Sequence, residues 1–592
     1  MQLNINEFTD NLVKFKSYRI AQAKTLWINH HDLFLLDGAC WNYENFADKF
    51  AYANKNSGCF SDIEFDKHDK ILFAERYGGV GIGGNGGGVR CGNMDDFQIK
   101  GTGINPVLGN HGNYNHSTGN YSLTESVTEV INSQIYSKIL PIGTVKTYGL
   151  ISIGVSQYVF DPFGYKLPLA IMVREACVRP AHFLRQPFFK HYEKYDAVIK
   201  KDTARVRAVN RALAKKFASH NSFVMYLGKF LANSANQFAF AKLFRIAHGA
   251  FSPSNVCFDG RWLDLTNMTM VPTGTNYAAE KDAVPFLAEL LSPLSVVEQV
   301  LYGYGKYNYT DLNMAVLTKY YYEQIDSYFL HYIVKLFGID PSEIENTVAV
   351  AERKILIKPV IRLIEANKQV SVAFPNIDNK MDSMQFWIET LFISLTKTSE
   401  HAAPLNICEK DIDAFKSLFF SSYQSQDNSD LSFSGYVSSA LIKSLRKLYY
   451  APFFYLGRIK NNIDEFLSVA DQDELANHIH SYSDGASWIF DHKDTPTSIV
   501  IFSSENISIT YNSVENSYEL KIKYEEYNTI CAGTDVLTKI NLHDEDQFMV
   551  GGYCFKAGLI RMMEMLGTME KLEVSTTIAN GSVASPCDMA SV

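Results

Sequence analysis

The sequence predicts an α+β protein in which a β-rich region is followed by a long helical region and then by a smaller α+β domain. Three observations predict this order. Short segments with alternating apolar and polar residues concentrate before residue 185. Stretches with helical periodicity run from residue 203 and dominate to about residue 463. Strand-like alternation returns between residues 498 and 524.

Composition supports a folded protein and argues against two functional classes. The chain has 592 residues, of which 46% are hydrophobic and 20% charged, values typical of ordered globular proteins rather than of disordered ones. At roughly 150 residues per domain this length has room for about three or four domains or for one large elaborated domain. The net charge of −9 does not favour phosphate backbones or anionic lipid, so we expect no nucleic-acid partner.

The cysteine pattern and the N-terminal sequence predict a cytoplasmic protein. The nine cysteines are widely spaced and form no CxxC pair, which indicates reduced thiols and no metal bound at sulfur. The first residues lack the basic and apolar regions of a secretory signal. No segment reaches the roughly 18 uninterrupted apolar residues of a membrane span.

These patterns divide the chain into four predicted parts. An N-terminal extension covers residues 1–69, a β-rich lobe 70–185, a helical lobe 186–463, and a C-terminal α+β domain 464–592 that ends in a loose tail. Within the extension, the apolar run 32–37 fits either a strand or a buried helical turn.

The β-rich lobe has a distinct order of predicted elements. A strand at 70–74 leads into a segment, 78–90, in which eight of thirteen residues are glycine, and a second strand at 97–100 follows it. The later elements are a helix that begins at Ser122 and reaches Leu140, and strands at 147–156 and 167–174.

A glycine-rich turn between strands is suited to phosphate binding, because backbone N–H groups can approach phosphate oxygens where no Cβ stands in the way. Lys100 ends the next strand, in the position of the kinase lysine that holds phosphates, and Glu129 on the following helix can pair with it. The residues predicted to surround the nucleotide are Gly84, Asn85, Gly86, Gly87, Gly88, Arg90 and Lys100.

A second motif lies in the helical lobe. His248 begins a loop that contains Asn255, and Asp264 follows across a predicted two-residue turn at Asp259-Gly260. An Asn and an Asp so placed are similar to the pair that holds Mg²⁺ in protein kinases. Glycine loop, lysine, helix glutamate, loop asparagine and aspartate occur in the kinase order.

Several segments resemble the selenoprotein O (SelO) family of pseudokinases. They are residues 97–103, residues 129–134, residues 173–176 with His182 and Arg185, and the span from His248 to Asp264. The resemblance covers roughly residues 70–270. It implies a protein-kinase-like bilobal fold that binds ATP in a flipped orientation and transfers AMP to protein hydroxyls, here with an additional C-terminal α+β domain.

Residue by residue, the resemblance implies that Lys100 contacts phosphate, that Glu129 orients Lys100, and that Asn255 and Asp264 hold Mg²⁺. Arg174 matches the family arginine that reaches the terminal phosphate. Arg185 matches the second arginine, although a few extra residues separate it from Arg174, and Arg179 is the alternative. The resemblance therefore implies a nucleotidyltransferase with ATP and Mg²⁺ as its cofactors.

One departure from the family bears on the acceptor. The family has an aspartate, proposed as general base, immediately before the Mg-binding asparagine, whereas this sequence has Ser254. A hydroxyl acceptor benefits from a base, but a carboxylate is already ionised and needs none. Either the enzyme is impaired, or its acceptor is a carboxylate and its product an acyl-adenylate.

The second reading matches a narrower resemblance, to the larger maturation proteins of siderophore-peptide microcin pathways. It implies that the acceptor is the C-terminal carboxylate of a precursor peptide, activated for attachment of a glucosylated siderophore, with a small acyltransferase-like protein as partner. The strands between 498 and 524 offer a unit that can hold an extended peptide by strand addition.

Two alternatives stay open at the level of sequence. A phosphotransferase would bind ATP in the ordinary orientation, release ADP and leave Arg174 dispensable. A non-catalytic scaffold would bind ATP without turnover and use the C-terminal domain to recruit a partner.

Overall fold

A computed structural model describes the chain in ranges. The described residues are 3–38, 40–55, 63–79, 82–109, 118–158, 166–271, 288–338, 392, 419–420, 422–424, 431–467, 472–495, 497–523, 528–530 and 533–571. They separate into two compact units, one formed by the described residues up to 332 together with 451–487, the other by those of 333–450 and from 488 onward. The predicted tail after residue 576 lies outside the described residues.

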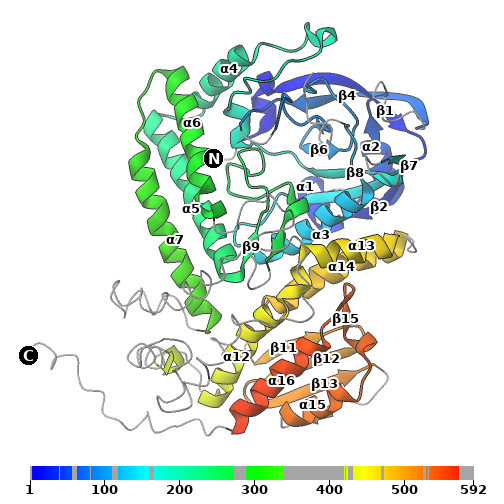
Figure 1. Cartoon of the computed structure of the whole chain (residues 1–592), viewed down its shortest axis with the longest axis vertical. Coiled ribbons are helices and arrows are strands. Elements are labelled where there is room, and N and C mark those ends of the chain that lie inside the picture. Colours follow the sequence, from blue (N-terminus) through cyan, green and yellow to red (C-terminus); the bar gives the residue numbers. More distant parts are fainter. Residues whose placement is uncertain are drawn as a thin grey trace, which may run out of the picture. The chain divides into compact units, whose positions relative to one another are not determined.

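The first unit is built on an eight-stranded antiparallel sheet (Figure 1). The strand order across it is β2-β7-β8-β6-β5-β4-β1-β3. The strands are β1 (Leu12–Ile20), β2 (Lys24–Ile28), β3 (Tyr52–Ala53), β4 (Phe65–Glu75), β5 (Cys91–Met94), β6 (Phe97–Lys100), β7 (Thr147–Tyr158) and β8 (Lys166–Glu175). The strands predicted at 70–74, 97–100, 147–156 and 167–174 are thus confirmed.

The segment predicted as an N-terminal extension, residues 1–69, contributes strands to this sheet. Strands β1, β2 and β3 all lie within residues 1–69, yet β1 pairs with β4 and β2 pairs with β7 inside the same sheet. Residues 32–37, which were compatible with strand or helix, belong to helix α1 (His30–Asp37), whose Asn29 side chain accepts a hydrogen bond from the Asp32 N–H as an N-cap. Helix α2 (Tyr43–Phe50) packs on β2.

Helix α3 (Leu123–Ile139) packs on β7 and β8 and confirms the helix predicted to begin at Ser122. The Ser122 side chain accepts a hydrogen bond from the Glu125 N–H, which satisfies one of the free donors of the first turn. Glu129 and Asn132 stand three residues apart and therefore on one face of α3. This face meets the segment that follows Asp264, because the Asn132 amide donates to the Leu265 carbonyl at 2.7 Å.

The helical region of the first unit contains the following elements: α4 (Asp202–Ala214), α5 (His220–Phe244), α6 (Ser292–Asn308), α7 (Met314–Leu336), α13 (Leu456–Leu467) and α14 (Gln472–Ile489), of which α7 and α14 each extend a few residues past the unit boundary. Between α5 and α6 the chain forms β9 (Ile246–Ala247), paired with β10 (Thr269–Met270). The predicted turn at Asp259-Gly260 is present, since Val256 and Trp262 form an antiparallel bridge around it and Gly260 has a φ of +91°.

The second unit contains a four-stranded antiparallel sheet in the order β11-β12-β13-β14, comprising β11 (Ser498–Ser503), β12 (Ile507–Asn512), β13 (Ser517–Ile522) and β14 (Asn528–Ile530). It confirms the strands predicted between 498 and 524 as far as these are described. Helix α12 (Phe433–Tyr449) contacts β11, α15 (Gly533–Asn541) contacts β13 and β14, and α16 (Lys556–Lys571) packs on α12 and α15. A short β15 (Met549–Val550) pairs with β16 (Tyr553–Cys554).

The observed architecture confirms the mixed α+β class, while the kinase-like arrangement stays a prediction. The predicted domain boundary at residue 464 falls inside α13, and the second unit also takes in α12, which sequence patterns placed in the helical lobe. Within the described ranges, no helix combines the length and apolar character needed to cross a membrane.

Candidate functional site

Four charged side chains from four segments of the first unit meet at one place. Lys100 ends β6, Glu129 lies on α3, Arg174 lies on β8, and Asp264 follows the turn at 259–260. The Lys100 ammonium donates to Glu129 Oε2 at 2.7 Å and to Asp264 Oδ1 at 2.8 Å. The Arg174 guanidinium donates to Glu129 Oε1 at 2.8 Å and to the same Asp264 oxygen at 2.9 Å. We call these four residues the charge cluster.

Burial makes the charge cluster electrostatically strong. The side chains of Lys100, Glu129 and Arg174 are 3–4% exposed, whereas that of Asp264 is 27% exposed. Burial by itself raises the pKa of Glu129, but the charges of Lys100 and Arg174 outweigh it and hold the pKa below its ordinary value. The pKa of Asp264 is lowered in the same way, against burial, chiefly by Arg174 and then Lys100. The charges of two cations therefore balance those of two carboxylates. Asp264 is the most exposed residue of the charge cluster.

Polar side chains next to the charge cluster form hydrogen bonds that hold the Arg174 guanidinium in place. Gln98 Oε1 accepts from Arg174 Nε at 2.8 Å and from the Arg179 guanidinium at 3.0 Å. Arg179 also donates to the Ser254 carbonyl at 3.0 Å and lies 3.5 Å from Glu75 Oε2. Strand register explains the first contact, because Gln98 on β6 stands directly opposite Arg174 on β8.

Glu75 is the buried counter-charge for Arg179. Burial opposes its ionisation, but Arg179 and the hydrogen bonds from His182 and Asn93 lower the pKa of Glu75 to about 2. The pKa of His182 is lowered by burial despite its contact with Glu75. The Arg179–Glu75 pair is thus charged. Through the hydrogen bond from Arg179 to the Ser254 carbonyl, it links the end of β4 to the loop that carries Asn255.

Tyr121 covers the charge cluster on another side. Its hydroxyl donates to Glu129 Oε2, and its ring lies 4.5 Å from the Lys100 ammonium and 4.7 Å from the Arg90 guanidinium. An aromatic face attracts cations, so the ring stabilises Lys100 without neutralising it. Arg90 itself donates to the Asn120 carbonyl at 3.3 Å and lies 3.7 Å from Glu125, beside the cluster rather than in it.

The two predicted metal ligands lie next to each other across the turn. The Leu263 N–H donates to the Asn255 carbonyl at 3.2 Å, which brings Asp264 next to Asn255 along the paired backbone. Asp264 has a φ of +58°, an uncommon conformation for a residue with a side chain. The Asn255 amide donates to the Ala250 carbonyl at 2.8 Å, so the side-chain nitrogen is engaged and the oxygen faces away from that contact.

Glu289 anchors the loop that carries Asn255. Its carboxyl oxygens accept hydrogen bonds from the N–H groups of His248 and Gly249, both at 2.9 Å. Burial raises the pKa of Glu289 to about 7 in spite of these bonds. The His248 ring contacts the Leu263 carbonyl at 3.0 Å, and burial lowers the pKa of this histidine to about 4. His248 is therefore a neutral residue that joins the loop to the segment before Asp264.

Ser254 offers a hydroxyl where the resembled family has a carboxylate. The hydroxyl contacts the Ser252 hydroxyl at 2.9 Å and donates to Asn255 Oδ1 at 3.3 Å. It can orient the Asn255 side chain, but a hydroxyl at neutral pH is no general base.

The glycine-rich segment is packed in a way that limits its predicted role. The N–H groups of Asn85, Gly86 and Gly88 donate to the carbonyls of Ile82, Val107 and Glu75. A Cβ at Gly87 would stand 1.9 Å from the Glu75 carbonyl oxygen, and one at Gly86 would meet the Phe189 ring at 2.6 Å. The Glu75 backbone therefore requires glycine at 87, and the Phe189 ring favours glycine at 86. Three of the N–H groups predicted to approach phosphate already have protein acceptors.

Arg185 lies apart from the charge cluster. Its side chain is exposed, and its backbone carbonyl accepts from the Gly79 N–H at 3.2 Å. Arg179, the alternative considered from the sequence, is buried and shares Gln98 with Arg174. The structure thus joins Lys100, Glu129, Arg174 and Asp264 directly, and places Arg179 rather than Arg185 beside them.

The donor set suits Mg²⁺ and nucleotide only in part. The carboxylate of Asp264 and the amide oxygen of Asn255 are the hard oxygen ligands that Mg²⁺ prefers, with remaining positions left to phosphate and water. In the part of the chain that the structure describes, no group of three His, Cys, Asp or Glu side chains is placed to hold a metal ion. The described residues therefore fit a Mg²⁺ ion that takes its remaining ligands from phosphate and water. The cations Lys100 and Arg174 suit phosphate oxygens, whereas Asn85, Gly86 and Gly88 do not offer free N–H groups.

Sequence reasoning missed Gln98, Glu75, Tyr121 and Glu289. Gln98 was detectable, because it stands two residues before Lys100 on one strand and so on the same face. Glu75, Tyr121 and Glu289 carry no such local signal, because the fold brings each of them to partners that are distant in the sequence.

Comparison with protein-family models and with curated proteins finds no match to this chain.

Proposed function

We propose that this protein is an ATP- and Mg²⁺-dependent adenylyltransferase that transfers AMP to a peptide or protein acceptor. The observation that carries the proposal is the convergence of Lys100, Glu129, Arg174 and Asp264 from four separate segments into one buried group. Two cations in a water-poor site suit the charge on phosphate oxygens, and charge neutralisation with positioning dominates catalysis of transfer at phosphorus.

Each residue has a role in this proposal. Asn255 and Asp264 hold Mg²⁺, which when bound neutralises phosphate charge. Lys100 and Arg174 exchange their contacts with Asp264 for phosphate oxygens, while Glu129 keeps both cations in place. Gln98 and Arg179 fix the orientation of the Arg174 guanidinium.

The acceptor we propose is a carboxylate, that of a peptide C-terminus. Ser254 supplies no base beside Asn255, and a carboxylate needs none because it is ionised at neutral pH. An acceptor oxygen bonds to the α-phosphorus, the bond from that phosphorus to the bridging oxygen breaks, and pyrophosphate leaves. In this proposal the activated peptide is the substrate for attachment of a siderophore glycoside, with a small acyltransferase-like protein as partner.

The test uses the full chain with Mg²⁺, a candidate precursor peptide and ATP labelled in parallel at the α- or the γ-phosphate. The proposal expects α-label on the peptide or release of pyrophosphate, and loss of both in Asp264→Ala. Sensitivity of the adduct to hydroxylamine would identify a carboxylate acceptor. A γ-label on the peptide would show a phosphotransferase, and tight ATP binding without turnover, also with the partner protein present, would show a scaffold.

The scaffold has one observation in its favour. Asp264 is already satisfied by two cations, and three N–H groups of the glycine-rich segment already have acceptors, so the site is internally neutral without a ligand. The measurement that separates the two is the effect of Mg²⁺ on ATP affinity in wild type and in Asp264→Ala. If the protein is an enzyme, Asp264→Ala loses both Mg²⁺-dependent ATP binding and product formation. If it is a scaffold, neither wild type nor the variant forms product.

A further inference from the structure

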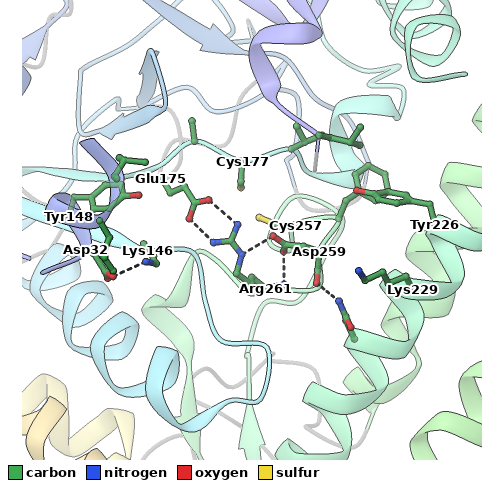
Figure 2. A pocket seen from close by; sticks show the side chains of 17 residues that line it. Asp32, Lys146, Tyr148, Glu175, Cys177, Tyr226, Lys229, Cys257, Asp259 and Arg261 are labelled. Atoms are coloured by element: carbon green, nitrogen blue, oxygen red, sulfur yellow. Dashed lines mark hydrogen bonds and ion pairs between the residues drawn. The ribbon is translucent and has the colours of Figure 1, made fainter. Parts of the chain in front are cut away.

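The first unit contains a cavity of about 570 Å³ outside the charge cluster. Its walls come from α1, from the end of β8 and the residues that follow it, from α5 and from the turn at 256–261. Figure 2 shows its labelled side chains. A volume of this size lies within the range of about 300–1,000 Å³ that is typical of small-molecule sites.

The cavity and the charge cluster lie on opposite faces of the same backbone. Arg174 and Glu175 are consecutive in β8, and successive strand side chains point to opposite faces. Arg174 joins the cluster, whereas Glu175 lines the cavity. The segment 259–264 is divided in the same way. Asp259 and Arg261 line the cavity, whereas Asp264 belongs to the charge cluster. The cavity is therefore a second site and not an extension of the first.

Apolar and aromatic groups form much of the cavity wall. Leu35 and Leu36 of α1 line it with 62% and 42% of their surface exposed, which is unusual for adjacent leucines. Tyr148 and Tyr226 add aromatic surface, and the thiols of Cys177 and Cys257 lie between these two tyrosines in Figure 2. These groups favour a ligand with an apolar body.

Three cations and three carboxylates line the wall, and five of these six groups are held in ion pairs with one another. Lys146 pairs with Asp32 at 2.7 Å. Arg261 binds both oxygens of Glu175, at 2.6 and 2.9 Å, and contacts Asp259 at 2.8 Å.

Lys229 on α5 is the exception. Its side chain is exposed and forms no ion pair among the described residues, and Figure 2 shows the amine end directed toward Asp259. The wall therefore offers one cation that is not already paired.

We propose that this cavity binds an amphipathic monocarboxylate, a small molecule with one carboxylate and an alkyl or aromatic body. The carboxylate pairs with Lys229, and the body covers Leu35, Leu36 and Tyr226. The wall is formally neutral, and Lys229 is the cation that a ligand carboxylate can reach without breaking an ion pair of the described residues. A nucleotide or polyphosphate is disfavoured, because Arg261 and Lys146 are already held by carboxylates and three carboxylates line the wall.

The test compares three probes of equal chain length on the full chain by titration calorimetry, below their micelle concentrations: decanoate, decanol and decyltrimethylammonium. We expect decanoate to bind at least about threefold more tightly than decanol, from the added ion pair, and the ammonium probe to bind least. Lys229→Gln should remove the preference for decanoate over decanol. Lys319→Gln, at an exposed lysine on α7, is the matched control and should retain it.

A second variant separates the apolar contribution from the charge. Leu36→Asn changes an exposed side chain and should weaken decanoate and decanol by the same factor while the melting temperature stays unchanged. Equal affinity of wild type for all three probes, a preference that survives Lys229→Gln, or no binding of decanoate would each overturn the proposal. None of these outcomes depends on ATP, so they leave the proposed adenylyl transfer to its own test.

Discussion

The two units each contain a buried group of two cations and two carboxylates, and the comparison shows what distinguishes a candidate site from a structural tie. In the second unit the group is Arg446 and Lys447 of α12 with Asp491 and Asp494. Arg446 is fully buried, as are the cations of the charge cluster. Asp491 and Asp264 even share the left-handed backbone conformation, with φ values of 68° and 58°.

The difference lies in what the cations bind besides carboxylates. Arg446 also donates to the carbonyls of Ile489 and Val500, and Asp494 accepts from the Val500 N–H at 3.1 Å. This group therefore ties the chain between α14 and β11 to α12. Among the described residues, the cations of the charge cluster donate hydrogen bonds to side chains, namely those of Gln98, Glu129 and Asp264. Such contacts can be exchanged for ligand oxygens without moving the backbone.

The largest expected effect breaks the structural tie. Arg446→Met leaves Asp494 without its cation and removes the donor to the carbonyls of Ile489 and Val500, while Asp491 keeps Lys447; this should cost about 3–5 kcal/mol of stability. Urea unfolding measures the loss, and hydrogen exchange should localise it to the segment between α14 and β11. A loss below about 1 kcal/mol would show that the group is not a tie.

The second prediction concerns pH and Glu75. Its pKa of about 2 lies below the ordinary 4.5, so ionised Glu75 stabilises the fold fully above pH 4.5, and this contribution, about 3 kcal/mol, is lost as the pH falls from 4.5 through 2. The stability difference between wild type and Glu75→Gln should therefore shrink across this window. Urea unfolding at several pH values measures it. A difference that stays constant would contradict the charged Arg179–Glu75 pair.

The third prediction tests whether the charge cluster serves chemistry more than stability. Lys100→Met should reduce the proposed AMP transfer by about 100-fold, because the proposal places this preorganised cation at the phosphates, and should cost less stability than Arg446→Met. Product formation and urea unfolding are measured on the same preparations. If Lys100→Met destabilises the protein as much as Arg446→Met while any turnover is unaffected, the cluster is a second structural tie.

The smallest expected effect concerns Gln98, a positioning residue. Gln98→Leu leaves donors of Arg174 and Arg179 unpaired and should cost about 1–3 kcal/mol of stability, whereas Gln98→Glu restores an acceptor. A purely structural role predicts equal kcat in the two folded variants. A role in orienting Arg174 predicts that kcat falls in the leucine variant and recovers in the glutamate variant.

Local sequence determined the elements that carry the charge cluster. Alternation over residues 97–100 and 167–174 gave β6 and β8, and a capping serine with helical periodicity gave α3, because these signals depend on neighbours within a few residues. The joining of Lys100, Glu129, Arg174 and Asp264 was expected from the order of motifs and a family resemblance, and no local pattern specifies it.

Tertiary structure alone decided the rest. It placed strands of residues 1–69 inside the sheet and brought Glu75 to Arg179, since strand partners are chosen by packing over the whole domain. It closed the glycine-rich segment against Val107 and Phe189, and it left Arg185 exposed. It also formed the cavity beside Lys229. Local patterns fix which backbone a segment adopts, but only long-range packing decides which side chains share a buried, low-dielectric space and so which charges must pair.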